Sequence, residues 1–480
     1  MRIPNSQVQN RSGESRYERQ RSAFPPSRRQ STAIAVLGAE SSQAGTHMLM
    51  AASAAAGIGQ LACDFPGRAG PTAHWFHRPW PHVVKNLCSE AECSFLDPDF
   101  PAADLHVEDV ENAWIVQWAA DLAAATISLS DLATQRIEVP TLVVICTAAG
   151  VLIGRFLSPA AALSEVSRAA SACSLHVPEP GPSELSVLAA GLALNEIMLG
   201  PRAHDSPASP LVGFYCLGQP RRTMTSPDAS FADLAAQIIR SPARTPASFR
   251  GRRFIMIGAG AIGTWVGLIA AMEQQVQLDI HDGDVVEIHN LNRQVLFANT
   301  ESGLHKAPTL ANELGLLDPQ GRYVGRTKYV ATPSDIEDVT GSEALICVPD
   351  NDATRLICAD IARKNHLLFA TGGSSPTGGQ IVLSHPQGPC FRCITGHRDA
   401  DGSTPGNGPS CSRSPNDAVV SSNMVVAGLI ISELRKALAP DTTANIRFQG
   451  DSPAGNRLSR MVTQANCPHR AQPTSPSGGA

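Results

Sequence analysis

The stretch that decides the fold is residues 252–306, RRFIMIGAGAIGTWVGLIAAMEQQVQLDIHDGDVVEIHNLNRQVLFANTESGLHK. A short apolar run ends in Gly258-Ala-Gly260-Ala-Ile-Gly263, and Asp282 follows 19 positions after the last glycine. This spacing is typical of a strand, a tight turn and a helix whose N–H groups bind phosphate, followed by a second strand that ends in a ribose-binding acid. The glycine pattern alone does not identify the nucleotide, so the residues after Asp282 matter more.

Four polar side chains follow the second predicted strand. Two are cations and two are amides: Asn290, Arg293, Gln294 and Lys306. Cations at this place can neutralise the phosphates of ATP. A nicotinamide oxidoreductase would need the ribose-binding acid but has no use for this cluster. The pattern therefore indicates an enzyme that attacks a phosphate ester, with the oxidoreductase kept as an alternative.

Composition bounds the class of protein. The chain has 480 residues, enough for two or three domains, and its formal net charge of −5 provides no overall basic field for nucleic acid. Most of its twelve cysteines lie alone in apolar runs, which favours a reduced, cytoplasmic protein over a disulfide framework. Residues 254–272 are uncharged, but glycines break this run after a short strand, so we expect a soluble protein without a membrane span.

The chain reads as two copies of one fold. Residues 33–38 read as a strand that ends in glycine, and Thr46 precedes Asp64 by 18 positions, as Thr264 precedes Asp282. The first copy lacks the middle glycine of the turn and has a Glu there, which would repel phosphate. No Asn-x-x-Arg and no Lys follow the first copy's acid, so we expect that copy to be inactive.

Two further segments recur in the same order. Residues 187–197, VLAAGLALNEI, parallel residues 424–434, MVVAGLIISEL, with Ala, Gly, Leu and Glu at the same offsets. Small residues in this pattern suit a helix that packs closely on a partner. Residues 141–146 likewise read as a strand that parallels residues 344–348.

The motifs GxGxxG, D-x-D-x-V, N-x-x-R-Q and G-x-x-K, in this order, resemble the adenylation domain of the ubiquitin-activating enzyme superfamily. That superfamily includes the ThiF-type adenylyltransferases of thiamine and molybdopterin synthesis. The resemblance continues through VPDNDATR at residues 348–355, Cys390-x-x-Cys393 and the Ala-Gly pair at 427–428. It is specific over residues 250–450 and faint over residues 33–200.

The resemblance implies that ATP and Mg²⁺ are used to join the C-terminal carboxylate of a carrier protein to AMP. Positive charge is needed because the carboxylate must approach a tetra-anionic nucleotide. Asp282 would accept hydrogen bonds from ribose, Arg293 and Lys306 would neutralise phosphates, and Asp350 would hold Mg²⁺ or the attacking geometry. The expected nucleotide-binding residues are Gly258, Gly260, Gly263, Asp282, Asp284, Asn290, Arg293, Gln294, Lys306 and Asp350. Arg293 and Asp350 are also expected to act in catalysis.

The N-terminus gains a role from the same resemblance. Arg16-Tyr-Glu-Arg19-Gln20 is similar to the R-Y-x-R-Q signature that precedes the first strand in this family. Its second Arg reaches across the pseudo-dimer to the ATP phosphates of the partner half. Arg19 is therefore expected to act as an arginine finger on the C-terminal half. The alternative is a disordered basic arm, because the first 31 residues are rich in Arg and Ser.

The cysteines near the C-terminus suggest a zinc site. Cys390 and Cys393 form half of a tetrahedral site, for which the family supplies a second C-x-x-C near the end. Here that segment reads Cys467-Pro-His469-Arg470, so Arg occupies the position expected for the fourth ligand. His469 can replace it, which would give a Cys₃His site for Zn²⁺. The alternative is a group of buried thiols left from a lost site.

Cys411 lies in a Gly/Pro/Ser-rich loop at residues 402–416, with Arg413 close by. Modifier-activating relatives form a thioester in this region, and a reactive thiolate needs exposure and positive neighbours. The main hypothesis is an enzyme that adenylates the C-terminal glycine of a ubiquitin-like protein and transfers it to Cys411. A ubiquitin-conjugating-type enzyme would be the acceptor. The alternatives are a ThiF-type adenylyltransferase that acts on a sulfur carrier or peptide without thioester transfer, and a catalytically silent scaffold.

The expected architecture is an α/β protein with two Rossmann-like adenylation domains that form an internal pseudo-dimer, of which the N-terminal copy is degenerate. We expect a basic arm at 1–31, the inactive domain at 32–217, a linker at 218–250 with an amphipathic helix near 231–239, the active domain at 251–470 with a crossover loop at 394–420, and a disordered polar tail at 471–480.

Overall fold

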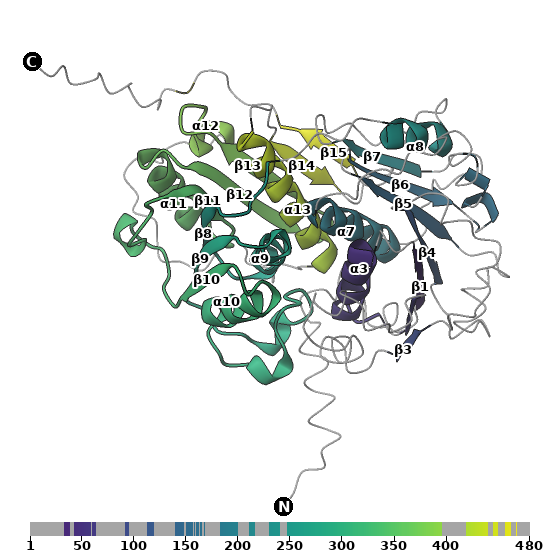
Figure 1. Cartoon of the computed structure of the whole chain (residues 1–480), viewed down its shortest axis with the longest axis horizontal. Coiled ribbons are helices and arrows are strands. Elements are labelled where there is room, and N and C mark those ends of the chain that lie inside the picture. Colours follow the sequence, from purple (N-terminus) through teal and green to yellow (C-terminus); the bar gives the residue numbers. More distant parts are fainter. Residues whose placement is uncertain are drawn as a thin grey trace, which may run out of the picture.

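The structure of the chain, a computed structural model, is an α/β fold with two sheets, one from each half of the sequence (Figure 1). The α/β class expected from the sequence is confirmed. No helix in the described part of the chain has the length and apolar character needed to cross a bilayer. The residues described are 33–38, 43–58, 60–63, 92–95, 113–119, 140–147, 150–156, 158, 160–162, 164–165, 168, 183–199, 211–216, 230–240, 247–395, 419–439, 445–449, 457–461 and 467.

The C-terminal sheet has eight strands, which are β8 Arg253–Ile257, β9 Gln277–His281, β10 Arg322–Arg326, β11 Ser342–Cys347, β12 Leu368–Ser375, β13 Gly378–Ser384, β14 Ile446–Gln449 and β15 Arg457–Arg460. Their order across the sheet is β10-β9-β8-β11-β12-β13-β14-β15. The neighbours from β10 to β12 are parallel, and those from β12 to β15 are antiparallel. Strand β8 is almost wholly apolar and buried, as expected for a central parallel strand covered on both faces.

The N-terminal sheet has seven strands, which are β1 Ala33–Gly38, β2 Gln60–Cys63, β3 Glu92–Phe95, β4 Ala113–Ala119, β5 Thr141–Thr147, β6 Gly150–Phe156 and β7 Leu211–Cys216. Their order, β3-β2-β1-β4-β5-β6-β7, repeats that of the other sheet from β10 to β14. The strand directions also agree except at one position. Strand β4 is antiparallel to β1, whereas β11, in the same place, is parallel to β8.

Four helices lie between the two sheets: α3 Gln43–Ala55, α7 Ser183–Leu199, α9 Ala261–Glu273 and α13 Val420–Ala437 (Figure 1). Helix α7 contacts α3, α9 and α13, and one hydrophobic cluster includes residues of both sheets and of all four helices. Residues 254–272, the apolar run that resembles a membrane span, are in fact β8, the turn and most of α9, whose sides are covered by α10, α13 and α7. The remaining helices are α8 Phe231–Arg240, α10 Lys306–Leu317, α11 Asp352–Lys364 and α12 Phe391–Thr395.

The contact between α7 and α13 is reciprocal at two glycines. A Cβ on Gly191 would lie 2.7 Å from Met424 Cβ and 2.9 Å from the Ser421 carbonyl oxygen. A Cβ on Gly428 would lie 2.8 Å from the Glu184 carbonyl oxygen and 2.9 Å from the nearest side-chain carbon of the other helix. The two helices therefore approach so closely that only glycine fits at either crossing point. These are the two segments that the sequence comparison paired.

A buried charge cluster joins the two halves beside these glycines. Arg435 on α13 pairs with Glu184 on α7, with Nε to Oε1 at 2.7 Å and Nη2 to Oε2 at 2.8 Å. Its Nη2 also lies 2.8 Å from Oε1 of Glu273, the last residue of α9, and its guanidinium lies 4.5 Å from the centre of the Phe249 ring. Burial raises the pKa of Glu184, while the charge and hydrogen bonds of Arg435 partly offset that rise.

Helix α8 and strand β5 of the N-terminal half can be compared with what the sequence predicts for them. The amphipathic helix expected near residues 231–239 is α8, and its Phe231 ring packs edge-on against Phe156, with 5.5 Å between ring centres. The expected pairing of residues 141–146 with 344–348 is wrong. Strand β5 occupies the place of β12, because β4 lies between β5 and β1. An apolar strand shows its type in the sequence but not its place in the sheet.

Candidate nucleotide site and cysteine cluster

The turn between β8 and α9 contains the three glycines of the predicted phosphate-binding pattern. Gly258 has a φ of +101°, which side chains rarely adopt, and a Cβ there would lie 3.1 Å from Pro349 N and from the Val348 carbonyl group. A Cβ on Gly263 would lie 2.1 Å from the Gly258 oxygen. Both positions must therefore be glycine for the turn to fold and to pack against β11.

Gly260 differs from the other two, because the space in front of it is open. The atom nearest to a Cβ built there is Nε2 of Gln294, at 3.9 Å. Gln294 is 2% exposed, and its Oε1 has no hydrogen-bond partner among the described residues. Gly260 is also the N-cap of α9, where N–H groups and the helix dipole favour an anion. An open glycine at a helix N-terminus, with the donor Nε2 of Gln294 as its nearest side-chain atom, fits a phosphate-bearing ligand.

Asp282 follows β9 and holds the glycine turn in place. Its Oδ2 accepts a hydrogen bond from the Ala259 N–H at 2.6 Å, and its Oδ1 accepts one from the Asp284 N–H at 2.8 Å. Burial raises the pKa of Asp282, and these hydrogen bonds and the charge of Lys306 partly offset that rise. The carboxylate therefore shapes the turn, and its hydrogen bonds to ribose stay a prediction.

Lys306 is the first residue of α10 and is 6% exposed. Its ammonium group pairs with Asp284, with 2.9 Å between Nζ and Oδ2. The other oxygen, Oδ1, accepts a hydrogen bond from the Tyr329 hydroxyl at 2.6 Å. Partial burial alone would raise the pKa of Asp284, but the hydrogen bonds from Tyr329 and Lys306 lower it. Lys306 is thus a buried cation held by one carboxylate near the glycine turn.

Asn290 is the last residue of the short helix η5, Ile288–Asn290, and Arg293 lies in the loop that follows it. Arg293 is 4% exposed, and its Nη1 donates to the His289 carbonyl and to Asn292 Oδ1, both at 2.7 Å. Asn290 Oδ1 accepts a hydrogen bond from the Glu287 N–H at 3.1 Å. These contacts fold the loop onto itself, and the expected contacts of both side chains with phosphate stay predictions.

Asp350 lies just beyond the carboxyl end of β11, where that strand abuts Gly258. It is exposed and forms no hydrogen bond or ion pair with any residue that the structure describes. Asn351, and not Asp350, caps α11 by accepting a hydrogen bond from the Thr354 N–H at 2.8 Å. The carboxylate of Asp350 is therefore open to a cation or a ligand.

All these residues lie around the topological switch point of the sheet, where the connections from two neighbouring strands run to opposite sides. From β8 the chain continues through α9 to β9 on one side, and from β11 through α11 to β12 on the other. The carboxyl ends of two parallel strands there bound the crevice in which open α/β sheets bind ligands. In the N-terminal sheet the antiparallel β4 brings its amino end to the corresponding place, so the described strands do not form such a crevice.

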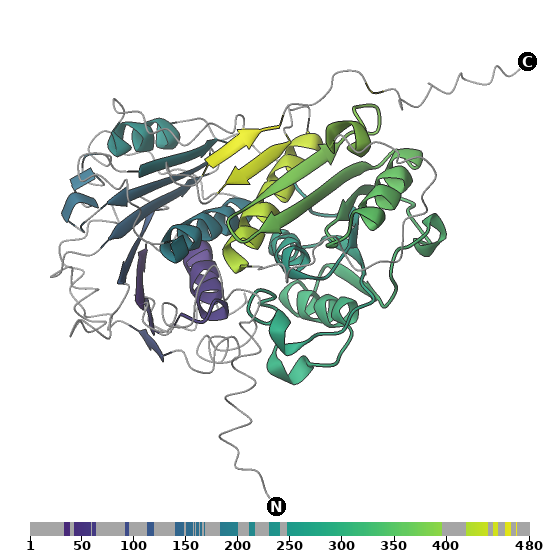
Figure 2. The ribbon, with the colours of Figure 1, turned by 180° about the vertical axis from the view of Figure 1, so that it is seen from behind.

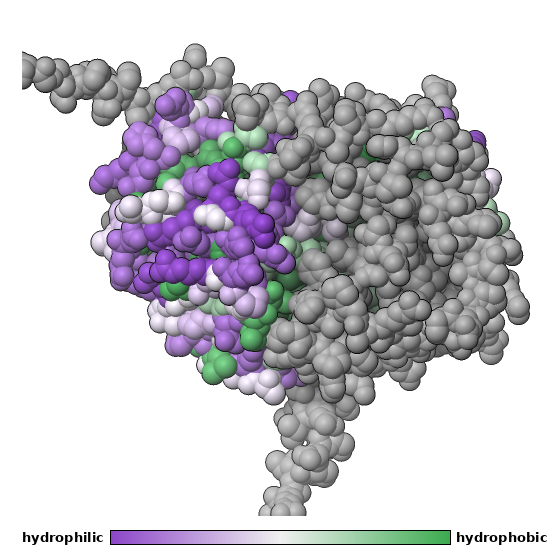
Figure 3. Space-filling view, viewed as in Figure 1, coloured by the Kyte–Doolittle hydropathy of each residue, from purple (hydrophilic) through white to green (hydrophobic). Residues whose placement is uncertain are grey.

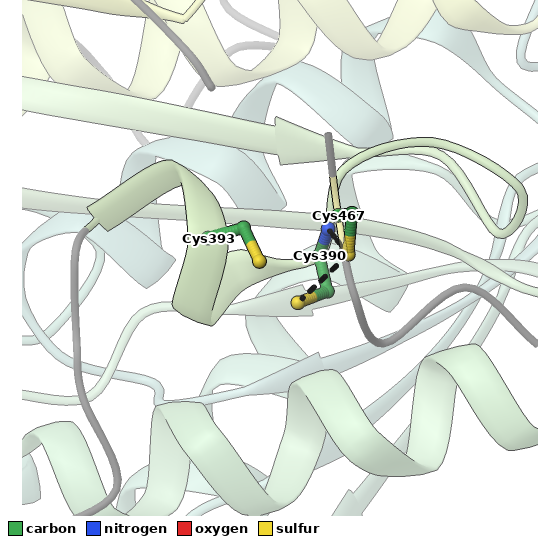
Figure 4. Close-up of side chains that lie close together, drawn as sticks. All are labelled: Cys390, Cys393 and Cys467. Carbon is green, nitrogen blue, oxygen red and sulfur yellow. Dashed lines mark hydrogen bonds between the residues drawn. The ribbon is translucent and has the colours of Figure 1, made fainter. Parts of the chain in front are cut away.

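Three cysteines of the C-terminal half lie together at the other end of this domain. Cys390 precedes α12, Cys393 lies on it, and Cys467 comes from a segment near the C-terminus (Figure 4). Their sulfur atoms all lie within 4.8 Å of one another, and Cys390 and Cys467 are separated by 3.6 Å and are not in a disulfide. Tetrahedral zinc with Zn–S bonds of about 2.3 Å places sulfurs about 3.8 Å apart. The donor set therefore fits three ligands of a structural zinc ion.

Some expected residues lie outside the described part of the chain. They are Arg19, Asp64, Cys411 and His469. The sequence reasoning also missed Tyr329, because its link to Asp284 spans 45 positions and no local pattern signals it. It missed the pair of Arg435 with Glu184 for the same reason, since the two are 251 positions apart.

Curated relatives resemble part of the chain. A protein of Aspergillus niger named "Adenylyltransferase and sulfurtransferase uba4" is 29% identical over 154 residues, which cover 30% of this chain and 32% of that protein. "SAMP-activating enzyme E1" of Haloferax volcanii is 30% identical over 159 residues, which cover 33% of this chain and 57% of that protein. This chain thus spans about a third of the length of the first relative and over half of the second.

A solved structure and a family model give the remaining comparisons. E. coli MccB is 17% identical, covers 48% of this chain and 69% of its own, and has a TM-score of 0.40, too low to support an argument. The ThiF family model matches residues 236–470, which contain the glycine turn, the loop with Arg293, Lys306 and the cysteine cluster. Residues 236–470 of this chain, just under half of it, are therefore similar to the ThiF family.

Proposed function

We propose that this chain uses ATP to adenylate the C-terminal glycine carboxylate of a ubiquitin-like or sulfur-carrier protein. A carboxylate oxygen of the carrier forms a bond to the α-phosphorus of ATP. The bond from that phosphorus to the oxygen bridging to the β-phosphate breaks, and pyrophosphate leaves. The product is a mixed anhydride between the carrier and AMP, which activates the carboxyl carbon for a later nucleophile.

One observation carries the proposal. Two almost fully buried cations, Arg293 and Lys306, follow the second strand of the nucleotide unit, as does Gln294, whose Nε2 is the atom nearest to the open Gly260. Buried positive charge aligned with a helix N-terminus stabilises the charge that develops on phosphates in the transition state. A dinucleotide oxidoreductase needs no such cations. The names of two curated relatives of part of this chain, an adenylyltransferase and an activating enzyme, support the same reaction class.

Mg²⁺ is expected with the nucleotide, and Asp350 is the residue of this crevice that fits it. The carboxylate is exposed and without a partner among the described residues, and hard divalent cations bind carboxylate oxygens together with phosphate. When bound there, the ion would neutralise phosphate charge. The residues of the chain itself would hold the turn, fix the phosphates and keep Lys306 charged beside Asp284.

Exchange of labelled pyrophosphate into ATP tests the adenylation step. We expect exchange only when a ubiquitin-like protein with a free C-terminal glycine is present, and none when that glycine is removed. The Asp350→Asn variant should lose most of the exchange while its melting temperature is unchanged. Lack of exchange with every ubiquitin-like carrier offered would favour the alternative of a catalytically silent scaffold.

We also propose that the N-terminal half completes the site as the degenerate copy of an internal pseudo-dimer. The shared strand order, the matching places of α7 and α13 and their reciprocal glycine contacts support this reading. Reciprocal contacts of this kind are expected at a two-fold interface. Arg19 would then extend from the N-terminal half to the ATP phosphates. Arg19→Ala should abolish exchange in a folded protein, and full exchange by that variant would refute the role.

Transfer to Cys411 is the second step of the proposal. The Cys411 thiolate attacks the activated carboxyl carbon, a thioester forms, AMP leaves, and the thiol proton goes to solvent. A ubiquitin-conjugating-type enzyme would accept the carrier next. The carrier should migrate with this chain as an adduct that reducing agents release, and Cys411→Ala should remove it. An adduct that persists in Cys411→Ala, or none at all with exchange intact, favours adenylation without thioester transfer.

Zinc is proposed as the occupant of the cysteine cluster, with His469 as the fourth ligand. The three sulfurs within 4.8 Å support this assignment. Metal analysis of the purified chain should find one zinc ion per chain, which Cys393→Ser should remove. A metal-free protein of unchanged thermal stability would leave the three cysteines as buried thiols.

The carrier would dock on the face of β13 to β15 that α13 leaves uncovered. Figure 2 shows these strands on the near side, with α13 behind them. Arg447 and Gln449 of β14 are exposed on this face and alternate with Ile446 and Phe448, which are buried on the α13 side. Strand β12 runs parallel to β11, so its carboxyl end lies at the same edge as Asp350. A carrier tail on this face would therefore lead toward the crevice.

A further inference from the structure

Tyr329 is the most exposed of the large hydrophobic side chains that the structure describes as exposed, at 65%. The visible face of the C-terminal half is mostly hydrophilic (Figure 3), so an exposed aromatic ring in this half needs an explanation. The ring is not loose. Its hydroxyl donates a hydrogen bond of 2.6 Å to Asp284 Oδ1, and this bond raises the pKa of Tyr329 to about 12. At neutral pH the hydroxyl therefore remains a donor.

The ring rests on a residue that has no side chain. A Cβ on Gly283 would lie 2.5, 2.6 and 2.7 Å from three carbons of the Tyr329 ring. Only glycine at position 283 lets the ring lie against the backbone between Asp282 and Asp284. The Tyr329 ring thus packs on the backbone of Gly283, and the residues before and after this glycine are both aspartates.

This contact of Tyr329 with Gly283 lies at the carboxyl edge of β9 and β10, beyond the residue expected to bind ribose. Asp282 links to β10 through its N–H, which donates to the Arg326 carbonyl at 3.1 Å, and Tyr329 follows three residues later. Phosphates at Gly260 and ribose at Asp282 define a direction across this edge. The base of the nucleotide would come next, on the side where the Tyr329 ring is exposed.

We propose that Tyr329 binds the purine base of the nucleotide by stacking, while its hydroxyl positions Asp284 and, through it, Lys306. This inference rests on the proposed function of the same site. The ring and the hydroxyl then serve opposite ends of one ligand. The ring acts on the base, whereas the chain of contacts from the hydroxyl to Asp284 Oδ1 and from Oδ2 to Lys306 Nζ acts on the phosphates.

Two variants separate the two parts of the side chain. Tyr329→Phe keeps the ring and loses the hydroxyl, and Tyr329→Leu loses both. Because the side chain is exposed, both variants should fold, and thermal melting checks this. Calorimetric binding of Mg²⁺–ATP and of Mg²⁺–tripolyphosphate to the full chain needs no carrier protein. Tyr323→Phe on β10, which loses a hydrogen bond to Asp318 instead, is the matched control.

We expect Tyr329→Leu to bind ATP about 5- to 150-fold more weakly than Tyr329→Phe, the range expected for loss of one stacked base. Tripolyphosphate, which has no base, should bind equally to both variants and more weakly than to the unaltered chain. Equal ATP binding by the Leu and Phe variants would overturn the stacking role. Failure of the unaltered chain to bind ATP at all would instead overturn the proposed function, and this inference with it.

Discussion

The two sheets of this protein share one strand order but differ in the direction of a single strand. In the C-terminal sheet β11 runs parallel to β8, so two carboxyl ends flank the glycine turn. In the N-terminal sheet β4 runs antiparallel to β1 and closes that place with its amino end. A nucleotide crevice therefore needs more than a glycine-rich turn. It also needs a parallel neighbour, because only then do two connections leave the edge on opposite sides.

The halves also differ in what they bury beside the first turn. The C-terminal half places Arg293 and Lys306 there, at 4% and 6% exposure. Burying a cation costs free energy unless a partner or a ligand compensates for it, so such residues mark a functional region. The described part of the N-terminal half has its buried charges elsewhere. Arg155 of β6 pairs with Glu196 of α7 at 3.6 Å, and two strands, β4 and β5, separate β6 from β1 in that sheet.

The largest effect is expected when the two halves are uncoupled. Arg435→Ala leaves the fully buried Glu184 and the part-buried Glu273 without their cation, and removal of one partner of a buried pair costs about 3–5 kcal/mol. Urea unfolding should report this loss. Arg447→Ala, an exposed arginine of the same half, is the control and should change stability by less than about 0.5 kcal/mol. Equal effects of the two variants would mean that the halves do not depend on this cluster.

The next effect tests whether the buried cations of the C-terminal half act on the nucleotide. Lys306→Ala removes a buried cation from the phosphate region and should lower pyrophosphate exchange by about 10²–10³-fold, the usual cost of one preorganised charge contact. Lys328→Ala removes a half-exposed lysine that pairs with Asp335 at 3.1 Å and should leave exchange unchanged. The assignment would fail if both variants kept full exchange.

A pH effect of intermediate size should also separate the halves. His281 is 3% exposed, and its Nδ1 has no partner among the described residues. Burial, together with the charge of Arg326, lowers the pKa of His281 to about 4. Since the unfolded state binds this proton below about pH 6.5 and the folded state does not, stability is fully present above that pH and is lost as the pH falls toward 4.

The expected loss at His281 is about 2 kcal/mol between pH 7 and pH 5, at about 1.4 kcal/mol per unit of pKa. Urea unfolding at the two pH values should show it. His281→Gln should remove this part of the pH dependence. The counterpart position in the other half, the last residue of β2, is Cys63 and not a histidine. A variant that keeps the full pH dependence would place the titrating group elsewhere.

The smallest effect compares the two first turns directly. Gly260→Ala fits the fold, because its Cβ would meet only Gln294 Nε2 at 3.9 Å, but the methyl group would stand where a phosphate approaches. We expect ATP binding to weaken about tenfold, or 1.4 kcal/mol. Gly38→Ala, at the end of β1, should leave ATP binding unchanged. Equal weakening by both changes would indicate that the N-terminal turn also binds nucleotide.

Local patterns in the sequence were sufficient for the glycine turn and the residues after it. The spacing from Gly258 to Asp282 reflects a strand, a turn and a helix of fixed lengths, and the structure has β8, α9 and β9 there. The small residues of 187–197 and 424–434 likewise predicted close helix packing, and Gly191 and Gly428 lie at the crossing of α7 and α13. In each case the relevant contacts follow from a short period in the chain.

Contacts between distant segments could not be predicted in this way. The direction of β4 depends on how the chain returns to the sheet. The Tyr329 ring needs Gly283, and Arg435 needs Glu184, which lies 251 positions away. The Cys390–Cys467 contact spans 77 positions, but here the C-x-x-C motif predicted a cysteine cluster. No motif predicted the Tyr329–Gly283 and Arg435–Glu184 contacts.

Local sequence patterns were therefore enough to identify the class of fold, the position of the glycine turn and the cations that follow it. These depend on local periodicity and on spacing along one chain segment. Only the tertiary structure decided which strand stands beside that turn, which side chains are buried without a partner, and how the two halves are joined. Those features depend on which surfaces meet, and the free energy of burying a charge or seating a ring is known only when its neighbours are known.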